Sequence, residues 1–196
     1  MKEVLEFEKT IAEYFNSPYA IAVDCCTHAI ELCLRYHNSN NVSCPKYTYL
    51  SVPMTFMKLG LDWKFTDEEW NNYYTIGNTN IIDGAVYWKQ NGYIPDTFMC
   101  LSFQFKKHLK LGRGGMILLD DKTAYDKLSK MRYDGRDISI PWALQDIDTL
   151  GYHYYMTPET ANKGIEEFNK VKDNPVTIWS YKNYPDLSTM KVFNAK

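Results

Sequence analysis

The sequence has little net charge of either sign. Its 196 residues carry 22 basic and 24 acidic side chains, which gives a formal net charge of -2. Such a balance provides no general attraction to a phosphate backbone or to an anionic membrane surface. The composition therefore argues against nucleic acid and membrane as partners.

The sequence also lacks a disulfide framework, a zinc motif and a long apolar run. Its five cysteines are an odd number without CxxC spacing, which suits a reduced chain better than a set of disulfides or a metal site. No apolar run approaches the ~20 residues of a membrane-spanning helix, and the N-terminus "MKEVLEFEKT" is too charged for a signal peptide. We therefore expect a soluble, cytoplasmic protein without a metal site.

The apolar residues that are present, 45% of the chain, are sufficient for the core of one compact domain. Their spacing predicts helices at 3–15, 28–37, 52–59 and 122–132, and strands at 19–23, 62–65, 79–83, 97–103 and 114–121. Strands that alternate with helices indicate an α/β domain with a mostly parallel sheet.

Chemically active side chains follow several of these strands. In a parallel sheet, ligands bind at the carboxyl ends of the strands. The sequence "DCCT", ending at Thr27, follows the first strand and opens a helix, whose N–H groups can receive a phosphate. Asp83 and Ser102 end two later strands, and Lys107 follows five residues after Ser102. We expect an anion site, a carboxylate, a hydroxyl and a lysine to share one rim.

A lysine, a phosphate cradle and an aspartate at a strand end are together what pyridoxal 5'-phosphate (PLP) requires. The lysine amine bonds to the cofactor and later moves a proton, and the carboxylate keeps the pyridine nitrogen protonated. The residues themselves thus suggest PLP as the cofactor.

Several motifs occur in an order that resembles one known family. They are "FEKTIAEYFNSPYAIAVDCCTHAIELCL", "PKYTYLSVPMTFMKLGLDWKFTD", "IIDGA", "SFQFKKHLKLGRGGMILLDD", "MRYDGRD" and "LGYHYYMTPETANKGIEEF". Together they resemble the DegT/StrS-type sugar aminotransferases, which are PLP-dependent enzymes of fold-type I. The resemblance covers about residues 5 to 171. It implies a three-layer α/β sandwich with a mostly parallel sheet, like the large PLP-binding domain of those enzymes.

The resemblance also implies a role for each matching residue. The family signature has a serine five residues before the lysine that holds PLP, which selects Lys107 rather than Lys106 as the catalytic lysine. Asp83 would partner the pyridine nitrogen and Tyr49 would stack on the ring.

The phosphate would lie at Ser102 and at the turn that contains Cys26 and Thr27. In the family a partner subunit completes each active site, so we expect a homodimer to which His153 contributes across the interface, near the phosphate.

The chain departs from the family pattern in four places. Cys25 and Cys26 stand where the family has small residues with glycine, and Val86 replaces a polar residue. The segment after Asp67 is short. The small C-terminal domain of the family is not recognisable, so we expect a large domain at 1–171 and a C-terminal tail at 172–196 in its place.

Three functions remain open at this point. The first is a PLP-dependent aminotransferase that uses an amino acid such as glutamate to aminate a nucleotide-linked keto-sugar, in cell-surface polysaccharide biosynthesis. The second is a non-catalytic homodimeric relative that serves as a binding or regulatory module. The third is a PLP-dependent sugar dehydratase, a family variant in which histidine replaces the lysine, and His108 lies one position from Lys107.

Each residue also has a structural alternative. The lysines of "KKHLK" are typical of a solvated basic face, and Asp83 could end a strand or cap a helix. Thr27 is an ordinary residue for the start of a helix. Tyr49 could pack in the core, and His153 could pack within an aromatic interface.

Overall fold

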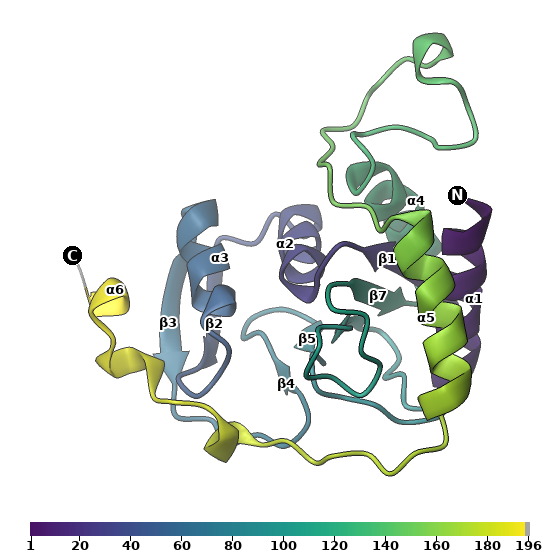
Figure 1. Ribbon diagram of the computed structural model, residues 1–196. Helices are drawn as coiled ribbons and strands as arrows, with labels where there is room; N and C mark the ends of the chain where they lie inside the picture. Colours follow the sequence, from purple (N-terminus) through teal and green to yellow (C-terminus); the bar gives the residue numbers. More distant parts are fainter. Residues whose placement is uncertain (195–196) are drawn as a thin grey trace.

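A computed structural model describes residues 1–194 and is built around a five-stranded sheet (Figure 1). The strand order is β1-β7-β6-β5-β4. The bounds are β1 (Tyr19–Val23), β4 (Tyr74–Thr75), β5 (Ile81–Asp83), β6 (Phe98–Ser102) and β7 (Gly115–Leu119). A separate parallel pair consists of β2 (Asn41–Pro45) and β3 (Asp62–Thr66).

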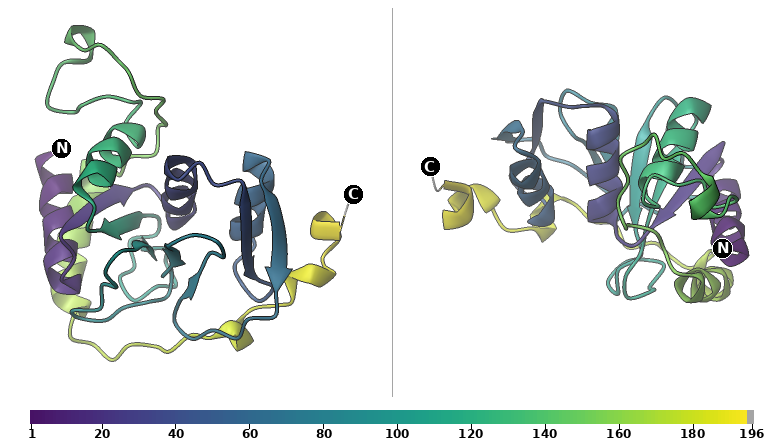
Figure 2. Two further views of the ribbon diagram at one scale, coloured as in Figure 1. Left: turned by 180° about the vertical axis from the view of Figure 1, so that it is seen from behind. Right: turned by 90° about the horizontal axis from the view of Figure 1, so that it is seen from above.

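Helices cover both faces of the sheet. On one face lie α1 (Lys2–Phe15) and α5 (Pro158–Val171), which run side by side in Figures 1 and 2. On the other lie α2 (Cys26–Tyr36) and α4 (Lys122–Met131), while α3 (Ser51–Leu59) packs on β2 and β3.

Alternate residues of each strand enter the two hydrophobic cores. In β1, Ile21 and Val23 join the core beneath α2, whereas Ala20 and Ala22 join the core beneath α1. A sheet that is apolar on both faces must be covered on both faces. The predicted three-layer α/β sandwich is thus confirmed, as are the predicted helices and strands, with small shifts of their bounds.

The prediction of a mostly parallel sheet is wrong. The pairs β1–β7, β7–β6 and β5–β4 are antiparallel, and only β5–β6 is parallel. A parallel neighbour requires a long crossover connection, usually with a helix. The turn from β4 to β5 is instead closed by Ile76 N–H donating to Ile81 O at 2.8 Å, and residues 103–114 between β6 and β7 contain no helix.

Three strands nevertheless run in the same direction. The two antiparallel steps from β1 through β7 to β6 restore the direction, and β5 is parallel to β6. The carboxyl ends of β1, β5 and β6 therefore meet at one edge of the sheet.

The ends of the helices follow from local side chains. The Asp121 carboxylate accepts hydrogen bonds from Thr123 N–H (2.7 Å) and Ala124 N–H (3.1 Å) at the start of α4. Thr157 caps α5 in the same way, accepting from Thr160 N–H at 3.3 Å. These caps satisfy N–H groups that have no partner inside the helix.

The segment after α5 crosses the lower edge of the molecule in Figure 1 and reaches β3. It contains η2 (Tyr181–Asn183), η3 (Leu187–Thr189) and α6 (Lys191–Asn194). Along this path Tyr181 N–H donates to Trp70 O at 3.1 Å and Leu187 N–H donates to Lys46 O at 2.9 Å. The segment is thus packed against the body, and the predicted division at residue 171 stays a prediction.

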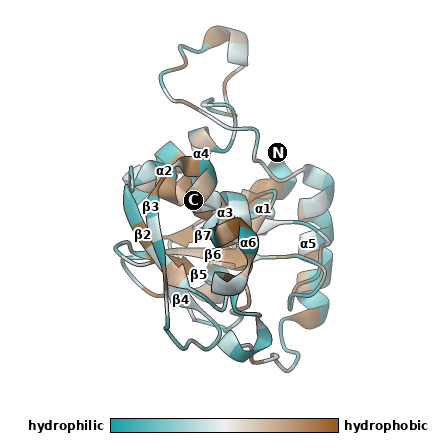
Figure 3. Ribbon diagram, turned by 90° about the vertical axis from the view of Figure 1, so that its left-hand side faces the viewer, coloured by the Kyte–Doolittle hydropathy of each residue, from teal (hydrophilic) through white to brown (hydrophobic). Residues whose placement is uncertain are grey.

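Residues 136–151, between α4 and α5, project from the body as an arm with one short helix, η1 (Trp142–Leu144) (Figures 1 and 3). Several of its large apolar side chains are exposed: Ile140, Trp142, Leu144, Ile147 and Leu150. Within residues 1–194, no helix combines the length and the apolar character needed to cross a membrane.

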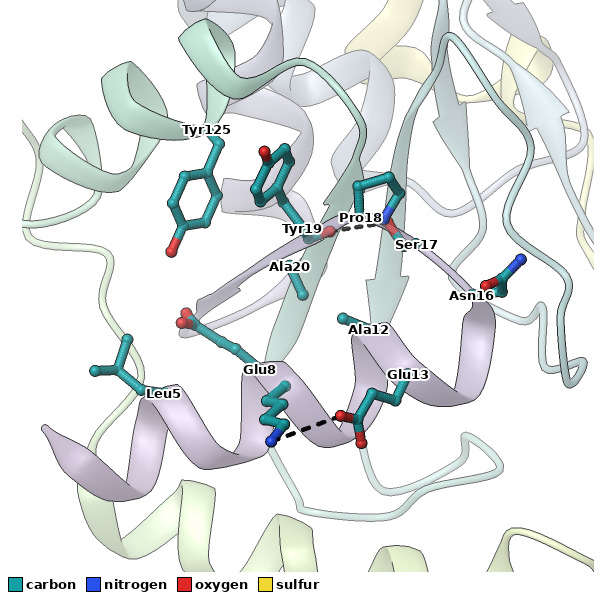
Figure 4. Close-up of a pocket in the computed structure, with 11 residues that line it drawn as sticks. Leu5, Glu8, Ala12, Glu13, Asn16, Ser17, Pro18, Tyr19, Ala20 and Tyr125 are labelled. Atoms are coloured by element: carbon teal, nitrogen blue, oxygen red, sulfur yellow. Dashed lines mark hydrogen bonds and ion pairs between the residues drawn. The ribbon is translucent and has the colours of Figure 1, made fainter.

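A groove of about 410 Å³ lies between α1 and the edge strand β1 (Figure 4). Glu8, which lines it, is buried and forms an ion pair with buried Arg132. The Glu8 carboxylate accepts a hydrogen bond from Ala22 N–H at 2.7 Å, and Arg132 donates to Ala22 O at 2.7 Å. Both charges thus serve to hold β1.

Candidate active site

A cavity of about 780 Å³ lies at the edge where β1, β5 and β6 end. Six of the seven site residues predicted from the sequence line this cavity: Lys107, Asp83, Ser102, Thr27, Cys26 and Tyr49. They come from four separate parts of the chain. The shared direction of the three strands brings five of them to this edge, and Tyr49 reaches it from the connection between β2 and α3.

Lys107 lies on the connection from β6 to β7. Its backbone N–H donates to Gln104 O at 2.9 Å, which forms a turn, and the buried side chain of Leu109 anchors the connection. Gly112 (φ +90°) and Gly114 (φ +151°) occupy conformations that favour glycine. The "GRGG" sequence thus allows the chain to return into β7.

The Lys107 side chain is half-buried and has no salt-bridge partner among the described residues. Burial lowers the pKa of Lys107, and the nearby Cys26 and Asp83 partly offset this. A lower pKa increases the neutral fraction of the amine, which is the nucleophilic form. A larger fraction of this amine is therefore neutral than of a lysine on a solvated basic face.

Asp83 ends β5 and is 6% exposed. Its carboxylate accepts hydrogen bonds from Tyr74 O–H at 2.6 Å and from Ala85 N–H at 3.0 Å. Burial raises the pKa of Asp83, while the Tyr74 and Ala85 hydrogen bonds and the charge of Lys107 oppose the rise. Both hydrogen-bond donors are neutral, so a cationic ligand would meet an unpaired carboxylate.

The start of α2 forms another side of the cavity. Cys25 is the N-cap and makes no side-chain cap, so the N–H groups of the first turn lack such a partner within the described chain. The Cys26 thiol donates to Cys100 O at 3.6 Å and thus points into the core. Thr27 shares a hydrogen bond of 2.8 Å with Ser51. The first-turn N–H groups and this hydroxyl can receive an anion.

Gly115 holds this helix end close to β7. A Cβ atom at Gly115 would lie 2.5 Å from the Cys25 carbonyl carbon and 2.6 Å from Cys26 N. Any larger residue would push the two elements apart.

Sequence reasoning missed a charged cluster at the same rim. The Asp24 carboxylate binds His28 Nδ1 at 2.6 Å and Arg113 Nη2 at 2.6 Å, and the His28 ring stacks on Tyr154 with centroids 3.6 Å apart. Burial opposes the charged form of His28, but the bonds to Asp24 and Cys25 raise its pKa to about 9. Asp24 and His28 are four positions apart, a spacing from which their contact at the start of a helix could have been predicted. Arg113 lies 89 positions after Asp24, so no local pattern could have predicted that contact.

Asp24, Cys25 and His28 also bring three potential metal-ligating atoms within 4.8 Å of one another. One Asp24 oxygen already bonds His28 and the other bonds Arg113. The carboxylate is thus engaged in ion pairs.

The segment after α5 supplies further lining residues that the sequence did not suggest. Trp179, Asn183 and Tyr184 all line the cavity. They lie more than 70 positions after Lys107. No local pattern could relate them to it.

The two histidines that the sequence analysis singled out lie outside the cavity. His153 is exposed and pairs with Asp134 at 3.1 Å, so the structure does not bring it to the other predicted residues within one chain. Its predicted role across a subunit interface stays a prediction. His108 Nε2 bonds Val171 O at 2.8 Å, and its ring stacks on Trp88. This histidine does not line the cavity, so its position gives no support to the dehydratase alternative, which stays a prediction.

The sequence matches the DegT/DnrJ/EryC1/StrS aminotransferase family over residues 1–83 and 88–177. The chain belongs to this family. The resemblance inferred from the motifs is thus confirmed. Comparison with curated protein sequences gives no match.

Solved structures share the fold of this family member. AtS13 from Actinomadura melliaura superposes with a TM-score of 0.78 at 18% identity, covering 88% of this chain and 61% of that chain. The sugar aminotransferase CalS13 from Micromonospora echinospora gives 0.74 at 16% identity, covering 88% and 62%. Spr1654 from Streptococcus pneumoniae, in its PLP form, gives 0.71 at 17% identity, covering 86% and 59%. The chain thus spans about three fifths of the length of these structures.

The cavity of this family member meets the requirements of PLP. It combines the Lys107 amine, the buried Asp83 carboxylate and the first-turn N–H groups of α2 in one space. Because Asp83 has only neutral donors, a protonated pyridine nitrogen would supply the charge that it lacks.

Proposed function

We propose that this chain binds PLP and transfers amino groups. The observation that carries the proposal is that Lys107, Asp83 and the N-terminus of α2 line one cavity. Membership of an aminotransferase family and the fold shared with Spr1654, which was solved in a PLP form, support it.

Each group has a distinct task in this proposal. When bound, PLP withdraws electrons from the substrate carbon that carries the amino group. Asp83 holds a proton at the pyridine nitrogen, and the Lys107 amine moves a proton at the substrate carbon. Tyr49, which is exposed at the cavity, covers the ring.

The phosphate lies at the start of α2 in this proposal. The N–H groups of Cys26 and Thr27 and the hydroxyls of Thr27 and Ser102 bind it. The half-buried position of this turn excludes water from part of the site.

The proposed substrate is a nucleotide-linked keto-sugar, with an amino acid such as glutamate as donor. Cationic side chains at the rim, Lys106 and Arg113 together with protonated His28, support an anionic substrate. CalS13 is itself a sugar aminotransferase. A role in cell-surface polysaccharide biosynthesis would accord with such a substrate.

We also infer a homodimer. Exposed Trp142, Leu144 and Leu150 give the projecting arm apolar side chains among its polar ones, and exposed apolar surface is typical of an interface. A second copy of the chain would cover the arm and bring His153 towards the partner's site. All five cysteines are free, which accords with a reduced compartment, and the cytoplasmic location stays a prediction.

The test is borohydride reduction of the purified protein with PLP, followed by peptide mass spectrometry. We expect one stable adduct, at Lys107. The matched variants are Lys107→Ala, which should give no adduct, and Lys106→Ala, which should label like the original chain. Scattered labelling of surface lysines, or none, would overturn the proposal and favour the non-catalytic relative.

A further inference from the structure

Residues 174 to 184, within the segment from residue 172 to 190, line two neighbouring cavities. Behind the Lys107 connection lies a second pocket of about 270 Å³, which is lined by Lys106, His108 and Lys110 among others. Lys107 and Trp179 line both this pocket and the cavity of about 780 Å³. Trp179 therefore stands at the boundary between them.

Backbone hydrogen bonds fix Trp179 in this place. Its carbonyl oxygen accepts from Asn72 N–H at 2.7 Å, and its N–H donates to Asn72 Oδ1 at 3.2 Å. Two residues later, Tyr181 N–H donates to Trp70 O at 3.1 Å. These bonds fix the backbone of Trp179 against the segment that contains Trp70 and Asn72.

The Trp179 ring contacts the catalytic lysine. Lys107 Nζ lies 5.9 Å from the centroid of the ring. At this distance the face of an indole ring attracts an ammonium group. Lys107 has no salt-bridge partner among residues 1–194, so the ring adds to the attraction that the nearby Asp83 exerts on its charge.

Tyr184 belongs to the same lining segment as Trp179. Its ring packs against Trp70 (centroids 5.4 Å apart) and Trp179 (6.2 Å). Tyr184 and Asp83 line the same cavity. Burial raises the pKa of Tyr184, and the charge of Asp83 raises it further. The hydroxyl is therefore neutral at pH 7 and can act as a hydrogen-bond donor.

We propose that Trp179 and Tyr184 are positioning residues for the cofactor. Trp179 holds the Lys107 amine at the wall of the larger cavity, and Tyr184 covers the Asp83 end of that cavity. This inference rests on the proposed PLP site. It assigns the 172–190 segment to the site itself.

The test compares Trp179→Leu and Tyr184→Leu with the conservative Trp179→Phe and Tyr184→Phe. Ile178→Ala is the matched control, because this neighbouring side chain is 74% exposed and lines neither cavity. The first readout is the dissociation constant of PLP from an equilibrium titration. We expect each leucine variant to bind about 5- to 30-fold more weakly. The phenylalanine variants and Ile178→Ala should stay within about threefold of the original chain.

The second readout needs no cofactor. Competitive acylation of the apoprotein across a pH series, with peptide mass spectrometry, gives the titration midpoint of Lys107. Loss of the ring in Trp179→Leu removes attraction for the charged form, so this midpoint should shift down, and Trp179→Phe should restore most of it. An exposed lysine in the same digest is the internal reference.

The two readouts separate the possible failures. If the original chain binds PLP and the leucine variants bind it equally well, the inference is wrong and the proposed function stands. If the original chain binds no PLP, the proposed function is wrong, and the Lys107 midpoint still tests the contact with Trp179. An unchanged or raised midpoint in Trp179→Leu would overturn that contact.

Discussion

Two buried sets of charges in this molecule are arranged in opposite ways. Glu8 and Arg132 pair with each other, and both also bind the backbone of Ala22. Asp83 instead accepts hydrogen bonds only from neutral donors, and Lys107 has no ion-pair partner among the described residues. The first set contributes to the fold, whereas the second remains available to a ligand.

This difference implies opposite effects on stability. A buried ion pair is costly to break, because removal of one partner leaves the other charge uncompensated. The raised pKa of Asp83 and the lowered pKa of Lys107 mean that the fold disfavours both charged forms. Site charges therefore lower the stability of the apoprotein while they prepare it for a cofactor.

The largest expected effect is that of Lys107→Ala. The variant should yield no 2-oxoglutarate from glutamate in a single-turnover assay with PLP, because the proton-moving amine is gone. Lys106→Ala is the control and should remain active. Near-normal product from Lys107→Ala would show that this lysine is not catalytic.

Asp83→Asn should separate function from stability. Loss of the carboxylate should slow the same reaction by about 10²- to 10⁴-fold. The pKa of Asp83 is raised in the fold, so ionisation of its carboxyl group lowers the free energy of unfolding as pH rises above the unfolded pKa of about 3.9. At pH 7 the neutral amide of Asp83→Asn avoids this loss, and the variant should therefore have a higher melting temperature than the original chain. A slower enzyme that also melts earlier would contradict the view that this charge is held at a cost.

Arg132→Met should have the opposite effect on stability to Asp83→Asn and should destabilise the fold. It leaves Glu8 buried without its cation, and one Glu8 oxygen already lacks a hydrogen-bond partner in the described chain. We expect a loss of about 3–5 kcal/mol in the free energy of unfolding. The control is the double variant Glu8→Leu with Arg132→Met, which should recover much of the loss. Denaturant unfolding measures both.

The smallest effect concerns His28. Its pKa in the fold, about 9, lies above the unfolded value of about 6.5, so its stabilisation is complete below pH 6.5 and is lost as pH rises through 9. The difference between these two pKa values corresponds to about 3 kcal/mol, which solvent screening reduces because the ion pair is only half-buried. Between pH 6 and pH 10 the free energy of unfolding should therefore fall by about 1 kcal/mol more than in His28→Gln. Parallel pH curves for the two proteins would refute the Asp24–His28 ion pair.

The sequence was sufficient for the local elements and for much of the site. Helical spacing located α1 and α4, and the position of Asp83 and Ser102 at strand ends placed them on one rim. That prediction succeeded although the sheet is mostly antiparallel, because β1, β5 and β6 share a direction.

What the sequence could not supply depends on long-range contacts. The direction of β7 relative to β6 depends on whether residues 103–114 form a helical crossover. The alternation of predicted strands and helices along the sequence does not reveal this direction. The contact of Trp179 with Lys107 and the pairing of Arg113 with Asp24 join residues that are 72 and 89 positions apart. Only the folded chain brings such groups together.

The binding of Glu8 and Arg132 to the backbone of Ala22 also affects how two copies of the protein could pair. An outer strand with free N–H and C=O groups invites a strand from another molecule. At Ala22 both groups are already occupied by Glu8 and Arg132, and β4, at the opposite border, is only two residues long. Pairing between the outer strands of two copies of this protein is thus discouraged at both borders of the five-stranded sheet.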